Sequence, residues 1–305
     1  MSIKFTAPEN HSILKLTDII TFRGEAAKEI VKVELKADGH YKLGEATVSE
    51  GKWDIEYHFN TDGHRHITVH GFDSTNQELA QDNLEIVLVG EITNVIGIDV
   101  SNYKGHGINW QAVKGSDVSF AFAKATEGIT YDDNCFDRNW EQMKAVGLIR
   151  GAYHFFHPAD DGKKQAEHFL KVVGNLEHND LPPVLDLELE EKGIDLNQRI
   201  ERVRDWLEFV EHRTGRKSLI YTSQGFWTSY MDNTEEFTKY PLWIANYTSQ
   251  PKPLVPANNW GENGWMFWQY TEKGHVEGVE GYVDKNRFAA SFDKLLAFIK
   301  DSFIN

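Results

Sequence analysis

Residues 181–190 read LPPVLDLELE, and acidic and apolar side chains alternate along this segment. Period-2 alternation predicts a β-strand, with Asp186 and Glu188 on one face and leucines on the other. Acids at positions where a buried strand would carry Val or Ile are costly unless the protein uses them. Residues i and i+2 lie about 6.6 Å apart along a strand, a separation that suits two carboxylates acting on one glycosidic bond. Taken alone, a strand with its acidic face in water is the more common explanation, so the rest of the chain must decide.

Composition limits the classes of protein to which the chain can belong. Its 305 residues favour two domains, and 40% hydrophobic residues can bury a sizeable core. A net charge of −15 argues against nucleic acid as a partner. No apolar run approaches the roughly 18 residues that insertion into a membrane requires. The first ten residues lack the apolar core of a signal peptide, so we expect another export route or a removed leader.

Cys135 is the only cysteine, which excludes an intrachain disulfide and a cysteine-rich metal site. His64, His66 and His70 could lie on one strand face, but a surface strand explains their spacing equally simply, and zinc sites usually need a better-defined ligand set. We therefore expect neither a metal nor a cofactor, and we expect a monomer.

Residues 1–92 contain short strand-like runs that are separated by turn signals such as Asp38-Gly39 and Asp62-Gly63. The runs span residues 30–35, 53–59, 66–70 and 84–89. Short strands punctuated by Asp-Gly predict hairpins and an antiparallel sandwich. We interpret this part as a small all-β accessory module that resembles immunoglobulin-like domains in length and pattern.

From residue 93 to residue 305 the pattern changes to strands that alternate with helical stretches. Predicted strands span residues 96–100, 118–124, 149–155, 183–189, 218–222, 242–247 and 265–270. A helix is predicted at residues 195–213, because Asp195 can cap its start and Gly215 follows its end. Alternation of this kind indicates an α/β domain with a parallel sheet, and seven or so strands favour a TIM-like β/α barrel.

Four acids are predicted near strand ends, where β/α barrels place catalytic groups. Asp99 is near the end of the first predicted strand, Asp186 and Glu188 near the end of the fourth, and Asp284 in a final Val-Asp segment. Asp99 or Asp284 alone would be explained as a cap or turn residue, but together with residues 186 and 188 they favour a catalytic site. Aromatic side chains near strand ends are candidates for binding sugar rings: Tyr153, Tyr221, Trp243, Trp268 and Tyr270.

Seven motifs that occur in order resemble those of the family 25 glycoside hydrolases, lysozymes of the N-acetylmuramidase type. They are GIDVSNY (97–103), KATEG (124–128), GAYHF (151–155), VLDLE (184–188), LWIAN (242–246), WQY (268–270) and VDKN (283–286). The resemblance covers about residues 95–300. It implies a modified β/α barrel with an irregular final strand region. It also implies cleavage of the β-1,4 bond between N-acetylmuramic acid and N-acetylglucosamine in peptidoglycan glycan strands.

The resemblance also implies roles for the acids. Glu188 is the expected general acid/base, and Asp186 either steadies the substrate's 2-acetamido group or acts as a nucleophile or electrostatic stabiliser. Asp99 and Asp284 are expected to orient groups, tune pKa values or bind sugar. Lys104 stands where the family commonly has Gln, which adds a cation near the mouth of the barrel.

Two other hypotheses come from different classes of protein. The chain could be a non-catalytic protein that recognises the cell wall through the barrel groove, or an interaction protein in which the β-module does the main work. The intact Asp186 and Glu188 pair favours the enzyme. Its place of action would be the cell wall, outside the cell or in the periplasm, as a phage-type lysin, a delivered effector or a secreted enzyme.

Overall fold

The computed structural model describes the chain except for residues 1, 17, 40, 60–62, 90–94, 105, 106, 117 and 305. For residues 63, 64, 89 and 104 only the backbone is described. The chain forms two compact units. One comprises Met1–Glu91 with Thr248–Gly264, and the other comprises Ile92–Tyr247 with Trp265–Asn305. The predicted boundary at residue 92 lies outside the described residues.

The N-terminal unit contains two sheets, one of three strands and one of five. The first has the order β1-β3-β6 and the second has the order β2-β8-β7-β4-β5. Neighbouring strands are antiparallel except for the parallel pair of β2 and β8. The strands are β1 (Ile3–Ala7), β2 (Ser12–Lys15), β3 (Ile20–Ala26), β4 (Lys32–Ala37), β5 (Tyr41–Thr47), β6 (Lys52–Tyr57), β7 (Gly63–Phe72) and β8 (Glu78–Val89).

Apolar side chains from both sheets form one core, to which β3 contributes Phe22 and β4 contributes Val33 and Leu35. Strands β4, β6, β7 and β8 overlap the four predicted runs, whereas β1, β2, β3 and β5 are additional. In β3 an inward position is Gly24, which faces Trp53 of β6 across the sheet. A Cβ atom at Gly24 would lie 2.2 Å from the Trp53 ring. The glycine therefore makes room for the indole. Because this inward position carries no apolar side chain, the sequence of β3 lacks the alternation that would predict a strand.

The second unit is a closed barrel of eight strands, in the order β10-β12-β13-β14-β15-β16-β17-β9 with β9 paired back to β10. The short strand β11 (Tyr131–Asp132) pairs with β10 outside the ring. The strands of the ring are β9 (Ile96–Val100), β10 (Val118–Glu127), β12 (Ile149–Phe155), β13 (Val184–Leu187), β14 (Leu219–Ser223), β15 (Leu242–Ala245), β16 (Phe267–Gly274) and β17 (Val283–Phe288). This architecture confirms the predicted barrel.

The direction of the strands departs from a regular β/α barrel at one place. Strand β17 runs antiparallel to both β16 and β9, whereas the other pairs in the ring are parallel. Residues 184–187 form β13, which lies between β12 and β14 and is buried along its whole length, whereas Glu188 and Glu190 lie beyond its end. The alternative of a strand with its acidic face in water is therefore wrong.

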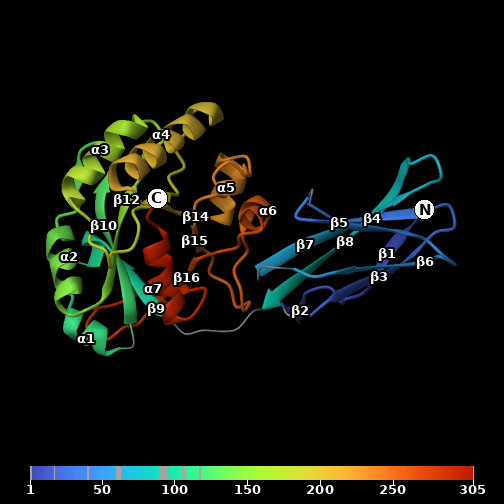
Figure 1. Cartoon of the computed structure of the whole chain (residues 1–305), viewed down its shortest axis with the longest axis horizontal. Helices are drawn as coiled ribbons and strands as arrows, with labels where there is room; N and C mark the ends of the chain where they lie inside the picture. The colour runs from blue at the N-terminus through green and yellow to red at the C-terminus, as the bar shows by residue number, and fades with distance from the viewer. Residues whose placement is uncertain are drawn as a thin grey trace. The chain divides into compact units, whose positions relative to one another are not determined.

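Helices cover the outside of the barrel, and Figure 1 shows α2, α3 and α4 beside strands β10 and β12. Helix α4 begins after Asp195, whose side chain accepts bonds from the amides of Asn197 and Gln198, and it ends at the left-handed Gly215, as predicted. None of the helices in the described ranges is long and apolar enough to cross a membrane. The α-helices of this unit are α1 (Trp110–Gly115), α2 (Phe136–Ala145), α3 (Gly162–Val173), α4 (Leu196–Thr214), α5 (Gln224–Tyr230) and α7 (Phe292–Asp301), and a 3-10 turn η1 spans Asn102–Lys104.

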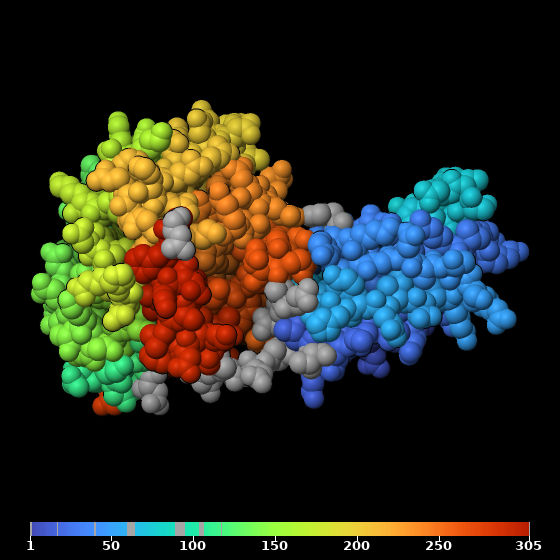
Figure 2. Space-filling view, in the orientation of Figure 1, coloured from blue at the N-terminus to red at the C-terminus, as the bar shows by residue number. Residues whose placement is uncertain are grey.

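The C-terminal helix α7, red in Figure 2, lies at the surface of this unit and buries Leu295 and Ile299. The short α6 (Pro256–Gly261) belongs to the other compact unit. Its residues 257–260 have φ between 50° and 56°, the left-handed region that costs non-glycine residues roughly 1–2 kcal/mol each.

The barrel interior has an apolar floor and a polar mouth. Phe120, Phe122 and Phe267 are fully buried in its core, and Phe122 stacks on Trp243 with ring centroids 4.3 Å apart. Side chains at alternate strand positions point inward, so the inward residues one step nearer the mouth are Lys124 on β10 and Asp186 on β13. The floor thus supports a layer of polar groups that open toward solvent.

We predict that Gly162→Ala destabilises the barrel. A Cβ atom at this first residue of α3 would lie 2.1 Å from the backbone oxygen of Arg202 on α4, and a backbone atom cannot rotate away. The substitution should lower the free energy of unfolding by about 2 kcal/mol, measured by denaturant titration. Gly225→Ala on α5 is the control, because its Cβ would meet no heavy atom within 4 Å. Equal stability of the two variants would contradict this account of the α3–α4 contact.

Candidate active site

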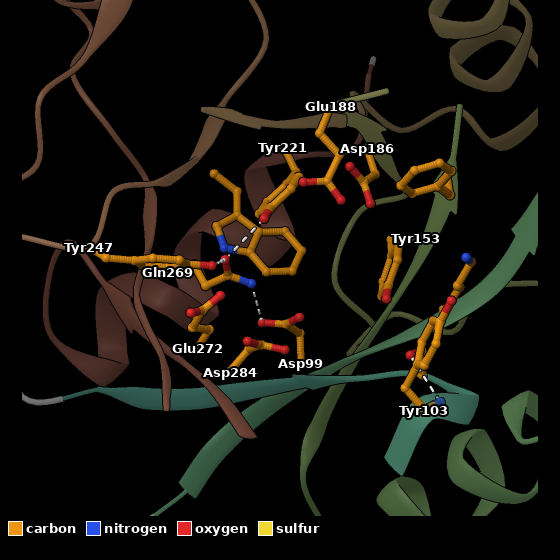
Figure 3. Close-up of a pocket in the computed structure, with 14 residues that line it drawn as sticks. Asp99, Tyr103, Tyr153, Asp186, Glu188, Tyr221, Tyr247, Gln269, Glu272 and Asp284 are labelled. Carbon is orange, nitrogen blue, oxygen red and sulfur yellow. Dashed lines mark hydrogen bonds between the residues drawn. The ribbon is translucent and has the colours of Figure 1, made fainter. Parts of the chain in front are cut away.

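A pocket of about 320 Å³ opens at the mouth of the barrel, and Figure 3 shows the side chains that converge on it. Residues from all eight barrel strands contribute to it, on the strand itself or just beyond the strand end. The lining consists of Asp99, Ser101, Tyr103, Lys124, Tyr153, Phe155, Asp186, Glu188, Tyr221, Trp243, Tyr247, Gln269, Glu272 and Asp284.

The four predicted acids meet in this pocket as two pairs (Figure 3). Asp186 is the third residue of β13 and is 5% exposed, and Glu188 follows the last residue of that strand. Asp99 on β9 lies directly opposite Asp284 on β17 in the antiparallel register. Because β17 runs in the reverse direction, its first residues reach the same mouth as the last residues of the parallel strands.

Amide side chains orient Asp99. Gln269 Nε2 and Asn286 Nδ2 both donate to Asp99 Oδ2, at 2.9 and 2.7 Å. Asn286 Oδ1 in turn accepts a bond from Trp243 Nε1 at 2.7 Å. Gln269 Oε1 accepts from the hydroxyls of Tyr221 at 3.0 Å and Tyr247 at 2.7 Å. One oxygen of Asp99 is thereby held by the protein, and the network joins five strands of the barrel, β9, β14, β15, β16 and β17.

The carboxyl groups of the pocket bind protons more tightly than ordinary carboxyls. Burial and the charge of Asp284 raise the pKa of Asp99 to about 7, although the bonds from Asn286 and Gln269 oppose this shift. Burial and the charge of Glu188 raise the pKa of Asp186 well above its usual range. Burial also raises the pKa of Glu188, which Lys124 lowers and Asp284 raises. A carboxyl with a raised pKa can serve as a general acid near neutral pH.

Three of the five predicted aromatic residues line the pocket: Tyr153, Tyr221 and Trp243. Trp268 and Tyr270 are not among its described lining residues. The Trp268 indole donates to the backbone oxygen of Asn246, and both rings lie near the guanidinium of Arg287. The period of a strand explains this arrangement, because Gln269 between them points into the barrel. A substrate-binding role for residues 268 and 270 stays a prediction.

The sequence reasoning did not select several polar and aromatic residues of the site. Gln269 and Asn286 lie inside the quoted motifs WQY and VDKN, so their signal was present, but amides carry no catalytic signature by themselves. Tyr103 and Tyr247 are 89% and 52% exposed at the pocket. Glu272 reaches the pocket because the register of β16 shifts beyond Gln269, and no sequence pattern predicts that shift.

Other candidates from the sequence lie apart from the pocket or outside the described residues. The histidine of the GAYHF motif, His154, is fully buried, and its imidazole bonds to Thr126 and Gln165. His66 and His70 each lie near a glutamate, and the side chain of His64 is outside the described residues, as is that of Lys104.

A barrel whose mouth presents paired carboxyl groups with raised pKa values, beside aromatic rings, is the arrangement of a glycoside hydrolase. The chain belongs to the glycosyl hydrolases family 25, which it matches over residues 98–279. This confirms the predicted family.

Known proteins that resemble the chain agree with this membership. Lysozyme M1 of Streptomyces globisporus is 37% identical over 70% of this chain and 74% of the relative. Uncharacterized protein YegX of Escherichia coli K12 is 39% identical over 67% of this chain and 72% of the relative. The crystal structure of a Streptomyces coelicolor lysozyme superimposes with a TM-score of 0.65 at 36% identity, covering 70% of this chain and all of that chain.

We predict that Asp99→Asn stabilises the protein at high pH. The pKa of Asp99 is about 7 in the folded chain and ordinarily 3.8, so its stabilising contribution is complete below pH 4 and is lost as the pH rises through 7. Asparagine has no such loss, and its Oδ1 can still accept from Gln269 and Asn286. The melting temperature should therefore rise by about 5 °C at pH 8 and not at pH 4. An equal change at both pH values would show that ionisation is not the cause.

We predict that Asp284→Asn moves the basic limb of the pH profile of kcat/KM to lower pH. The charge of Asp284 raises the pKa of Glu188 and of Asp99, so without it Glu188, the expected general acid, loses its proton at a lower pH. Turnover of peptidoglycan between pH 4 and pH 9 measures the limb. Asp293→Asn on the outer helix α7 removes the same charge from an exposed position and should leave the profile unchanged.

Proposed function

We propose that the chain is a lysozyme that cleaves the β-1,4 bond between N-acetylmuramic acid and N-acetylglucosamine in peptidoglycan. The observation that carries the proposal is the placement of Asp186 and Glu188 at the mouth end of β13, facing one pocket. Family membership and the similarity to Lysozyme M1 support the same reaction. The enzyme would act at the cell wall, outside the cell or in the periplasm.

In the first step Glu188 is the general acid. Its side chain lies at the strand end, where it reaches the pocket and solvent, and burial raises its pKa, which favours the protonated form that a general acid needs. It donates that proton to the glycosidic oxygen as the bond to the anomeric carbon breaks. In the second step the glutamate, now ionised, accepts a proton from the water that attacks the anomeric carbon.

Asp186 is the electrostatic partner of this acid. Its Oδ1 atom is buried and accepts no hydrogen bond from the described residues, so it can accept one from the substrate. Mutual repulsion favours one proton on the pair of residues 186 and 188. With that proton on Glu188, the ionised Asp186 stabilises the positive charge that develops at the sugar. We propose that it holds the N–H of the 2-acetamido group while the acetamido oxygen attacks the anomeric carbon.

Asp99 and Asp284 form the opposite wall of the pocket and bind sugar hydroxyls. Asp99 Oδ2 is taken by two amides, so Oδ1 is the atom available to the substrate. Tyr153, Tyr221 and Trp243 supply apolar surface on which the C–H faces of a sugar ring can pack. Trp268 and Tyr270 would have to act from beyond the pocket lining.

We also propose that residues 1–92 form an immunoglobulin-like accessory module and that residues 93–305 form the catalytic domain. Support comes from the two sheets that share one apolar core and from the family match, which begins at residue 98. An accessory module beside a glycosidase suits docking on, or spacing from, the cell wall.

We predict that Glu188→Gln lowers kcat on purified peptidoglycan by about 10³-fold or more, because glutamine cannot transfer a proton. Release of reducing ends measures the rate. Borohydride reduction of the products should convert muramic acid, and not glucosamine, to its alditol. Glu190→Gln is the matched control, since Glu190 makes its bond to Tyr230 and is not among the described pocket residues. Full activity of the Glu188 variant would refute the proposed mechanism.

A further inference from the structure

Lys124 stands out among the groups of the pocket that the proposed mechanism does not use. It is the only lysine or arginine among the described lining residues, which include five acids. The residue is 7% exposed, and its side chain projects from β10 at the level where the apolar floor ends. A buried cation is costly unless it is paired or has a use.

The surroundings of Lys124 hold its ammonium group in one place. Nζ donates to Glu127 Oε2 at 2.5 Å and lies 4.7 Å from the ring centroid of Phe155 and 5.6 Å from that of Tyr131. Glu127 is itself fixed by His157, whose Nε2 lies 2.9 Å from Oε1. An ammonium has three donors, and among the described residues Glu127 accepts from one of them. Two donors are therefore left for a ligand in the pocket, on an ammonium that Glu127 and two aromatic rings surround.

The chemistry of the proposed substrate shows what such a donor could recognise. Muramic acid differs from glucosamine only in a lactyl ether on the oxygen of carbon 3. That ether ends in acyl oxygens, either of a free carboxylate or of the amide that joins the peptide. These oxygens accept hydrogen bonds, and the pocket's five carboxylates repel them. A fixed ammonium attracts them.

We propose that Lys124 binds an acyl oxygen of the 3-O-lactyl group and thereby makes the site selective for muramoyl over glucosaminyl sugars. This rests on the proposed function of the site. Lys124 is then a specificity-determining residue that touches the substrate away from the bond that breaks. Glu127, His157, Phe155 and Tyr131 are positioning residues that act through it.

The test is binding in a Glu188→Gln background, where turnover does not consume the ligand. The two probes are the tetrasaccharide of alternating N-acetylglucosamine and N-acetylmuramic acid with free lactyl carboxylates, and the chitin tetrasaccharide, which lacks the lactyl group. We expect Lys124→Met to weaken binding of the muramoyl probe by about 10- to 100-fold, the usual range for a bond to a charged group. Binding of the chitin probe, measured by the same calorimetry, should change less than about threefold.

Two further variants control for charge and shape. Lys171→Met removes a lysine from the exposed side of α3 and should leave both affinities unchanged. Lys124→Arg keeps the cation and should retain a preference for the muramoyl probe, although the longer side chain weakens it. Thermal denaturation of each variant identifies any that fail to fold, and Lys124→Gln then replaces the methionine.

Each outcome decides the proposal. An equal loss of affinity for both probes would show that Lys124 only supports the pocket, and no loss for either would show that it is not needed; both results overturn the proposal. A selective loss for the muramoyl probe supports it. Failure of the proposed function would be seen in a different measurement: the Glu188→Gln variant, with Lys124 intact, would still release reducing ends from peptidoglycan.

Discussion

The rest of the barrel depends on one constraint, the unfavourable free energy of placing several carboxyl groups close together in a partly buried pocket. Ionised acids repel one another and lose hydration there, and both effects raise the pKa values of Asp99, Asp186 and Glu188. The fold offsets part of that cost with the amides of Gln269 and Asn286 and with the buried ammonium of Lys124. The part of this cost that is not offset keeps the pKa values of the acids raised. Cleavage of a glycosidic bond requires an acid that holds its proton near neutral pH.

The layers of the barrel make this arrangement possible. Stacked aromatic and aliphatic side chains fill the floor, where Phe122 and Trp243 are in contact, so the side of the pocket below the acids is apolar. Trp243 belongs to both layers, since its ring packs on the floor while its indole N–H bonds to Asn286 in the polar layer. The orientation of Asp99 therefore depends on how well the apolar core packs beneath it.

The sequence predicted the barrel and the four acids because both leave local signals. Strand-helix alternation recurs along the chain, and an acid in an apolar strand such as β13 is conspicuous. The sequence did not predict Gln269, because an amide between two aromatic residues looks unremarkable until the strand face is known. It also did not predict β3, where Gly24 interrupts the apolar face to admit Trp53. In both cases the sequence does not show which side chain faces the residue: Asp99 for Gln269 and Trp53 for Gly24. Only the tertiary structure brings these residues together.

The reversed strand β17 has a consequence for the order in which the molecule can become active. It closes the ring by pairing with β9, and Asn286 and Asp99, which bond across that seam, are 187 residues apart in the sequence. Contacts between such distant segments carry the loop-closure entropy of nearly the whole domain. Before β17 has left the ribosome, the chain lacks Asp284, one carboxylate of the pocket. It also lacks Asn286, whose amide holds Asp99. Hydrolytic competence therefore requires that the last strand of the barrel is in place.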